Sequence, residues 1–155
     1  MAELHIEEFY KDAGVALAQL YAAFPRRINL FVEDIAGADE PDEFGLHSRR
    51  HMACFGALLW LAEEGLLRYV DTIRQEALDQ AVLTHAAFTR LSGPASAALV
   101  ASIAPEAATS TAPASVQADL STHIHLMRQA LQSGRSERIG RVVRASFFAD
   151  RTAPD

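Results

Sequence analysis

The sequence has little of several residue types, and each shortage excludes a class of protein. A single cysteine, Cys54, excludes an intrachain disulfide and a zinc site built from several cysteines. No stretch reaches the roughly 18 consecutive apolar residues that a membrane-spanning helix needs, and the acidic start MAELHIEEFYKD lacks the apolar core of a secretion signal. We therefore expect a cytoplasmic protein without a membrane partner.

Lysine is also scarce, because Lys11 is the only lysine among 14 basic residues. With 20 acidic residues, the formal net charge is −6, and it is unevenly spread. Residues 1–80 carry 15 acids and 7 bases, a balance of −8, whereas residues 81–155 carry 5 acids and 7 bases, a balance of +2. The net charge disfavours a surface devoted as a whole to nucleic acid. The uneven distribution leaves two alternatives: the two halves have different roles, or they face each other.

What the chain does have is 155 residues, half of them hydrophobic, which is enough for one domain, with or without a small appendage. Apolar residues recur every three or four positions from Phe9 to Phe24, which predicts a helix that Pro25 ends. Alternation predicts a strand over Ile28–Val32. The acid-rich residues 33–43 are expected to form a loop with at most one helical turn near Pro41, before a second helix that ends at Gly65.

After Gly65 the apolar period changes from helical to two. We expect a strand from Leu67 to Ile73, a polar connection over Gln75–Asp79, a strand over Gln80–Leu83, and a helix over His85–Leu91. The remainder predicts only helices and a linker: a small helix over 94–104, a Pro- and Ser-rich linker over 105–114, a helix from Ser115 to Gly134, and a last helix over Ser136–Phe148. The fold class is therefore α+β and mostly helical.

The middle of the chain resembles the second half of a winged helix-turn-helix domain. The resemblance rests on Leu61-x-x-x-Gly65-Leu66-Leu67-Arg68, a polar hairpin, and then Val82-Leu83-Thr84 before a short helix. Together with the order of the preceding elements, it covers about residues 8–92. It implies a winged-helix domain over residues 1–93 and a helical extension over residues 94–155.

The resemblance also implies a function, that of a non-enzymatic DNA-binding protein, expected to be a dimeric transcriptional regulator. The recognition helix would run from about Arg49 to Glu64, and its start would meet duplex DNA. The hairpin would be the wing that contacts phosphate or the minor groove. The implied DNA-binding residues are Ser48, Arg49, Arg50 and His51 at the helix start, with Arg74 and Gln75 on the wing.

A second hypothesis stays open, because acids lie directly upstream of the expected recognition helix and would repel DNA. In this alternative the domain is an acidic protein-interaction module, a subunit or inhibitor of a larger bacterial machine. The acidic residues that would meet the partner are Asp39, Glu40, Asp42 and Glu43.

The last helix carries arginines at every third position from Arg135 to Arg144. A solvated face is one interpretation; contact with phosphate, or pairing with the acidic loop of the same or another subunit, is the other. We include Arg138 and Arg141 among the partner-binding residues, and the resemblance implies a homodimer through the C-terminal helices.

Two histidine patterns could carry chemistry, but each has a simpler interpretation. His47, His51 and Cys54 share one helical face and could supply metal ligands, but a cysteine beside Phe55 is more typical of a core. His123 and His125 point about 100° apart on a helix, so they would not share one metal ion. The sequence therefore predicts no catalytic residue, no metal ligand and no cofactor.

Overall fold

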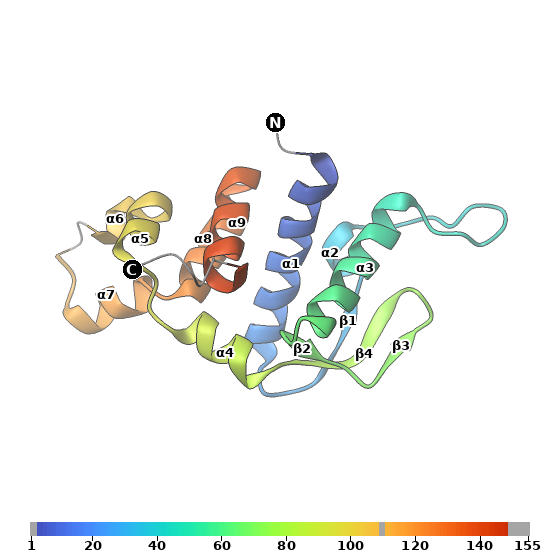
Figure 1. Cartoon of the computed structure of the whole chain (residues 1–155), viewed down its shortest axis with the longest axis horizontal. Helices are drawn as coiled ribbons and strands as arrows, with labels where there is room; N and C mark the ends of the chain where they lie inside the picture. The colour runs from blue at the N-terminus through green and yellow to red at the C-terminus, as the bar shows by residue number, and fades with distance from the viewer. Residues whose placement is uncertain (1–2, 109–110, 149–155) are drawn as a thin grey trace. The chain divides into compact units, whose positions relative to one another are not determined.

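The computed structural model describes residues 3–108 and 111–148 and divides into two compact units, Met1–Phe88 and Thr89–Asp155. Both units are shown in Figure 1, coloured along the chain. The first unit combines helices with a small sheet. In the described part of the second unit, the regular structure consists of helices and one isolated bridge between Pro94 and Thr122. The expected α+β, mostly helical class is thereby confirmed.

Two long helices supply much of the core of the first unit. α1 (Leu4–Ala23) buries one stripe that includes Ala13, Leu17 and Leu20, and it ends just before Pro25, as predicted. α3 (Arg49–Glu63) buries Cys54, Leu58 and Leu61 and packs against α1. Gly65 follows α3 in a left-handed conformation (φ 79°), which is the conformation that ends many helices.

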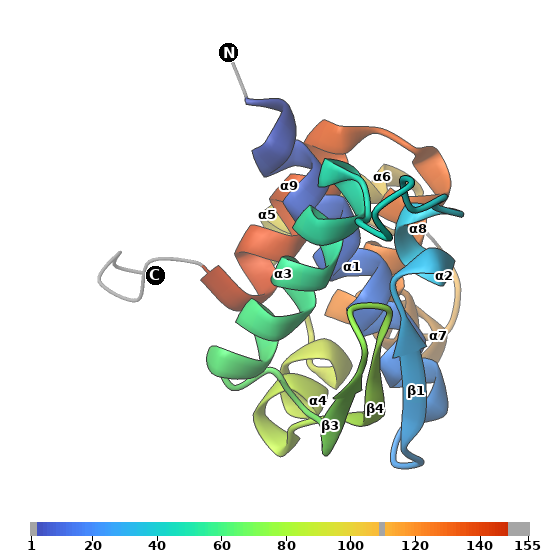
Figure 2. The same cartoon turned by 90° about the vertical axis from the view of Figure 1, so that its right-hand side faces the viewer.

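The sheet is antiparallel, and β4 (Ala77–Leu83) is its central strand. β1 (Ile28–Phe31) pairs with one edge of β4, and β2 (Leu67–Arg68) and β3 (Asp71–Ile73) pair with the other. In Figure 2, β1, β4 and β3 lie side by side. The expected polar connection over Gln75–Asp79 is wrong, because Arg74 takes a left-handed conformation (φ 53°) that closes the hairpin early and lets β4 begin at the buried Ala77.

A single helical turn, α2 (Glu33–Ala36), follows β1 and buries Ile35. The helical turn expected near Pro41 is absent from residues 37–48, which form a loop. In Figure 1 this loop extends away from the rest of its unit.

The second unit is reached through α4 (His85–Ser92), which Thr84 caps by accepting a hydrogen bond from the backbone of Ala87. The expected small helix is α5 (Ala97–Ile103), and the expected linker contains one helical turn, α6 (Pro105–Ala108). Residues 109 and 110 of that linker lie outside the described residues.

The single helix expected from Ser115 to Gly134 is wrong, because the structure has two helices there. α7 (Ala114–Leu120) stops at Ser121, and α8 (His123–Ser133) begins after Thr122, whose hydroxyl accepts from the backbone of His125 at 3.2 Å. Thr122 also bridges to Pro94, so tertiary pairing interrupts a pattern that is continuous in apolar residues.

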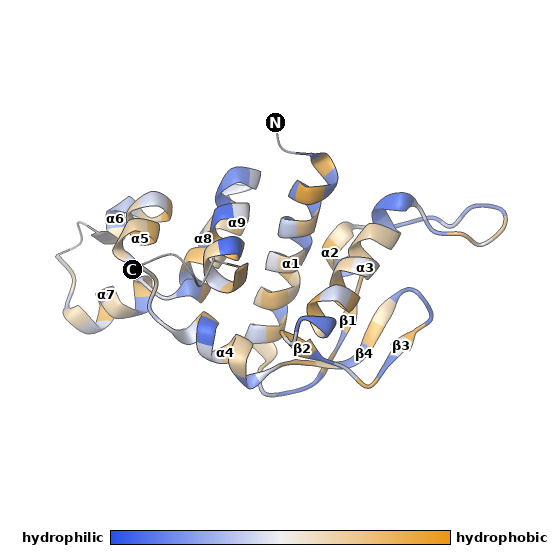
Figure 3. Cartoon of the chain, in the orientation of Figure 1, coloured by the Kyte–Doolittle hydropathy of each residue, from blue (hydrophilic) through white to orange (hydrophobic). Residues whose placement is uncertain are grey.

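The last expected helix forms α9 (Ser136–Val143) and continues as a π-helical turn (Arg144–Phe148). Ile139, Val142 and Val143 are buried, whereas hydrophilic residues gather at the start of α9, as Figure 3 shows. The helix thus has the two faces that the sequence predicted.

Candidate functional site

At the start of α3, three of the side chains predicted to contact DNA instead bind other groups of the protein: Ser48, Arg50 and His51. Ser48 caps the helix, since its hydroxyl accepts from the backbone of His51 at 3.1 Å. Arg50 makes a bidentate pair with Asp12 of α1, with nitrogen–oxygen distances of 2.7 and 2.5 Å. Arg49 is exposed. Of the two adjacent arginines, Arg49 is exposed and Arg50 is half-buried in its pair with Asp12.

The Asp12–Arg50 pair has a clear structural cause. The Asp12 side chain is only 1% exposed, so its carboxylate requires a partner within the protein. Hydrogen bonding to Asp12 raises the pKa of Arg50 above its usual range. Arg50 therefore links α3 to α1, and both of its terminal guanidinium nitrogens donate to Asp12.

His51 lies at the centre of the candidate site and is 4% exposed. Its Nε2 lies 2.7 Å from the backbone carbonyl oxygen of Gln75, at the turn of the β3–β4 hairpin. A carbonyl oxygen only accepts, so Nε2 carries the hydrogen. Gln75 thus reaches α3 through its backbone, while the side chains of Arg74 and Gln75 remain exposed.

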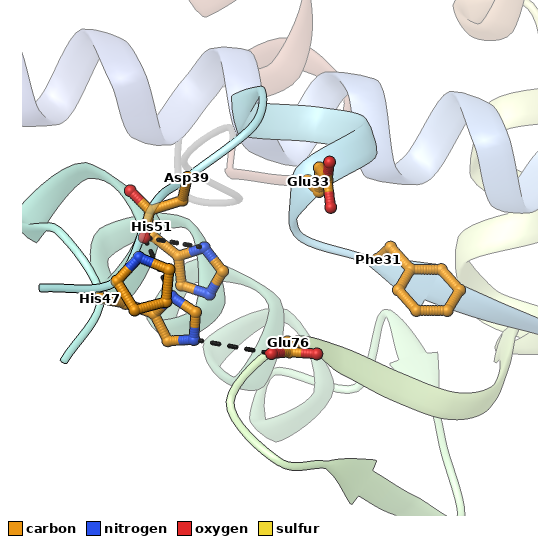
Figure 4. A pocket seen from close by; sticks show the side chains of 7 residues that line it. Phe31, Glu33, Asp39, His47, His51 and Glu76 are labelled. Atoms are coloured by element: carbon orange, nitrogen blue, oxygen red, sulfur yellow. Dashed lines mark hydrogen bonds and ion pairs between the residues drawn. The ribbon is translucent and has the colours of Figure 1, made fainter. Parts of the chain in front are cut away.

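Three side chains converge here: Asp39 from the loop, His47 just before α3, and His51 in its first turn. Asp39 Oδ2 lies 2.9 Å from His47 Nδ1 and 3.9 Å from His51 Nδ1. The two imidazole rings stack with centroids 3.8 Å apart and an interplanar angle of 8°. In Figure 4 both rings turn a nitrogen toward the Asp39 carboxylate. One potential ligand atom from each of the three residues lies within 4.8 Å of the others.

The surroundings of this cluster leave one nitrogen unpaired. Hydrogen bonds from Ser48 and His47 lower the pKa of Asp39 to about 2, so the group is a carboxylate at neutral pH. His47 Nε2 faces Glu76 Oε1 at 3.9 Å. His51 Nδ1 is buried and has no hydrogen-bond partner among the residues that the structure describes. That unpaired nitrogen is directed at a carboxylate.

A cavity of about 170 Å³ opens beside the cluster. Phe31, Glu33, Pro41 and Glu76 complete its lining (Figure 4). One carboxylate oxygen and two imidazole nitrogens can share protons or hold a divalent cation. These are the two chemical uses that the arrangement offers.

Sequence reasoning placed His47 and His51 on one helical face but set the row aside, because it interpreted its third member, Cys54, as a core residue. Cys54 shares the helical row with His47 and His51, but it is fully buried, and burial raises the pKa of its thiol to about 12. The third member of the cluster is Asp39, which a loop brings back to the start of α3. The one sequence feature that pointed to Asp39 was the acid-rich segment 33–43, which lies shortly before His47.

The remaining predicted partner residues lie in two places. Glu40, Asp42 and Glu43 are exposed in the loop that carries Asp39. Arg138 and Arg141 are half-buried in the second unit, where Arg141 donates to Glu137 at 2.8 Å and to Ser102. The structure therefore brings Asp39 into the candidate site and leaves its three acidic neighbours on the surface.

No helix in the part of the chain that the structure describes is long and apolar enough to cross a membrane. Comparison with family models, with curated proteins and with solved structures finds no match to this chain.

Proposed function

We propose that this chain is a non-catalytic interaction module that binds a protein partner through the tip of the loop between α2 and α3. The observation that carries the proposal is the exposure of two large apolar side chains there, 79% for Phe44 and 63% for Leu46. Exposed apolar side chains that gather on one element are typical of a binding surface. The binding tip is residues 42–46.

The binding tip is held in shape by its own hydrogen bonds. Asp42 Oδ1 accepts from the backbone nitrogens of Phe44 and Leu46, each at 2.9 Å, and the backbone of Asp42 bonds with that of Leu46. At the base, Asp39 accepts from the backbone of Ser48 at 3.1 Å, which joins the two ends of the loop. A compact loop closed at its base is typical of functional surface loops, and preorganisation lowers the entropy lost on binding.

The charge around the binding tip indicates the chemistry of the partner. Glu40, Asp42 and Glu43 are exposed beside the apolar pair. An apolar pocket with a basic rim on the partner would complement both features. The same acids disfavour duplex DNA, which carries one negative charge about every 1.7 Å.

The order of elements supports a winged-helix architecture for this module. α1, β1, α2 and α3 precede the β3–β4 hairpin, and β1 pairs with the far side of β4, which agrees with the order implied by the resemblance. Within that architecture the protein-binding role is favoured over the DNA-binding one, because Arg50 and His51 are engaged inside the fold.

Co-purification from the native cell tests the proposal. The wild-type chain should retain a stoichiometric protein partner, and Leu46→Asp should lose it, because a carboxylate does not enter an apolar pocket. Val116→Asp is the matched control, since Val116 is also exposed (43%) but lies in the second unit. Equal retention of the partner by both variants would contradict the proposal.

Binding of duplex DNA at low salt is the competing outcome. Fluorescence anisotropy should show no affinity for duplex DNA. Affinity that falls steeply with salt, and falls again in Arg49→Ala and Arg74→Ala, would establish DNA binding in place of the proposed role.

A further inference from the structure

We infer that Asp39, His47 and His51 form a site for a first-row divalent metal ion such as Zn²⁺, a property beyond the proposed protein binding. The inference begins with the unpaired Nδ1 of His51. Because Nε2 donates its hydrogen to the carbonyl of Gln75, Nδ1 of the neutral ring carries a lone pair. That lone pair is buried and lies 3.9 Å from a carboxylate oxygen, too far for a hydrogen bond.

A lone pair that faces a carboxylate inside a protein is unfavourable unless the nitrogen takes up a proton or a metal cation lies between the two groups. In a tetrahedral site with metal–ligand distances near 2.0–2.1 Å, the ligand atoms lie about 3.4 Å apart. Asp39 Oδ2 lies 2.9 Å from one imidazole nitrogen and 3.9 Å from the other. Each of these two distances needs to change by only about half an ångström. Because the two imidazole rings stack in nearly parallel planes, at least one ring must also turn so that both nitrogen lone pairs point at the same ion.

The groups behind the two imidazoles match those that support metal-binding histidines. Such a histidine usually donates its second ring N–H to a backbone carbonyl or a carboxylate, which fixes the tautomer. His51 already does so with Gln75. His47 would do so with Glu76, whose Oε1 is 3.9 Å from Nε2, once Nδ1 gives up its hydrogen bond to Asp39.

Two imidazole nitrogens and one carboxylate oxygen are donors that suit Zn²⁺, Co²⁺, Ni²⁺ and Fe²⁺ better than Mg²⁺ or Ca²⁺, which prefer oxygen ligands. A fourth position would open toward the cavity of about 170 Å³, which leaves room for water or a small anion. The metal would join the loop, the start of α3 and the β3–β4 turn, because each of these elements contributes a ligand or a supporting group.

Calorimetric titration of the untagged, chelator-treated chain with Zn²⁺ tests the inference, with the visible absorption of Co²⁺ as a second readout of the ligand set. The wild type should bind one equivalent of Zn²⁺. Asp39→Asn and His47→Gln should each abolish stoichiometric binding and the low-coordinate Co²⁺ absorption. Glu76→Ala should weaken binding about 10–100-fold, since it removes the acceptor that would support His47 rather than a ligand.

His5→Gln is the matched control, because His5 is an exposed histidine of the same unit that pairs with Glu3; its affinity should equal that of the wild type. Far-UV circular dichroism establishes that each variant is folded. Failure of the wild type to bind Zn²⁺ would overturn the inference, as would equal affinity in wild type, Asp39→Asn and His47→Gln. Either result leaves the co-purification test of the binding tip unaffected.

Discussion

At the scale of single residues, the two adjacent arginines at the start of α3 are expected to differ clearly in how much each contributes to stability. Replacing Arg50 by alanine leaves Asp12 buried and unpaired, so we expect Arg50→Ala to lower the free energy of unfolding by about 3 kcal/mol. Replacing the exposed Arg49 should change it by no more than about 0.5 kcal/mol. Urea unfolding of the two variants at neutral pH measures the difference, and equal losses would contradict a stabilising pair between Arg50 and the buried Asp12.

His123 provides a pH-dependent test in the second unit. Burial, and then the positive charge of Arg90, lower the pKa of His123 below its ordinary value of 6.5. The unfolded chain therefore takes up this proton at a higher pH than the folded chain, so the histidine's contribution to stability falls as pH drops through 6.5. NMR titration of the folded protein should place the midpoint for His123 below 6.5; a midpoint at or above that value would be inconsistent with its environment.

At the scale of elements, the shape of the binding tip depends on one side chain. Asp42→Ala removes the acceptor of two backbone hydrogen bonds, so the amides of Phe44 and Leu46 should exchange their hydrogens faster. Global stability should change little, because the tip is exposed. Hydrogen exchange followed by NMR measures this, with Glu43→Ala as the neighbouring control; unchanged exchange in Asp42→Ala would show that the side chain does not hold the tip.

The elements also show where prediction from sequence succeeds. The long helices and β1 could be predicted because each has a regular spacing of apolar residues within its own segment of the sequence. The early start of β4 and the break between α7 and α8 did not follow. The first depends on the left-handed backbone of Arg74 and the second on a bridge from Thr122 to Pro94, and neither leaves a periodic signal.

The candidate site was predictable only in part for the same reason. Helical spacing predicts that His47 and His51 lie together. Asp39 lies in an irregular loop, and no periodic pattern predicts that this loop brings it next to His47. Likewise, the winged-helix resemblance implied a DNA contact for Arg50, because no sequence pattern shows that Asp12 on α1 is buried and needs a partner.

At the scale of the whole molecule, the uneven charge along the sequence coincides with the division into two compact units. Residues 1–88 carry 15 acids and 7 bases, and residues 89–155 carry 5 acids and 7 bases, so the two units carry opposite net charges. Three exposed acids of the first unit lie beside its most exposed aromatic side chain, Phe44. A homodimer through the C-terminal helices stays a prediction, and Arg138 is one of the residues it would use.

The measurement that tests the central claim most directly is photo-crosslinking in the native cell with a photoreactive amino acid in place of Phe44. The proposed function predicts one dominant crosslinked protein from position 44, lost when Leu46→Asp is added, and none from the same probe at Val116. The same crosslinked products from both positions, or crosslinks only to nucleic acid, would contradict it.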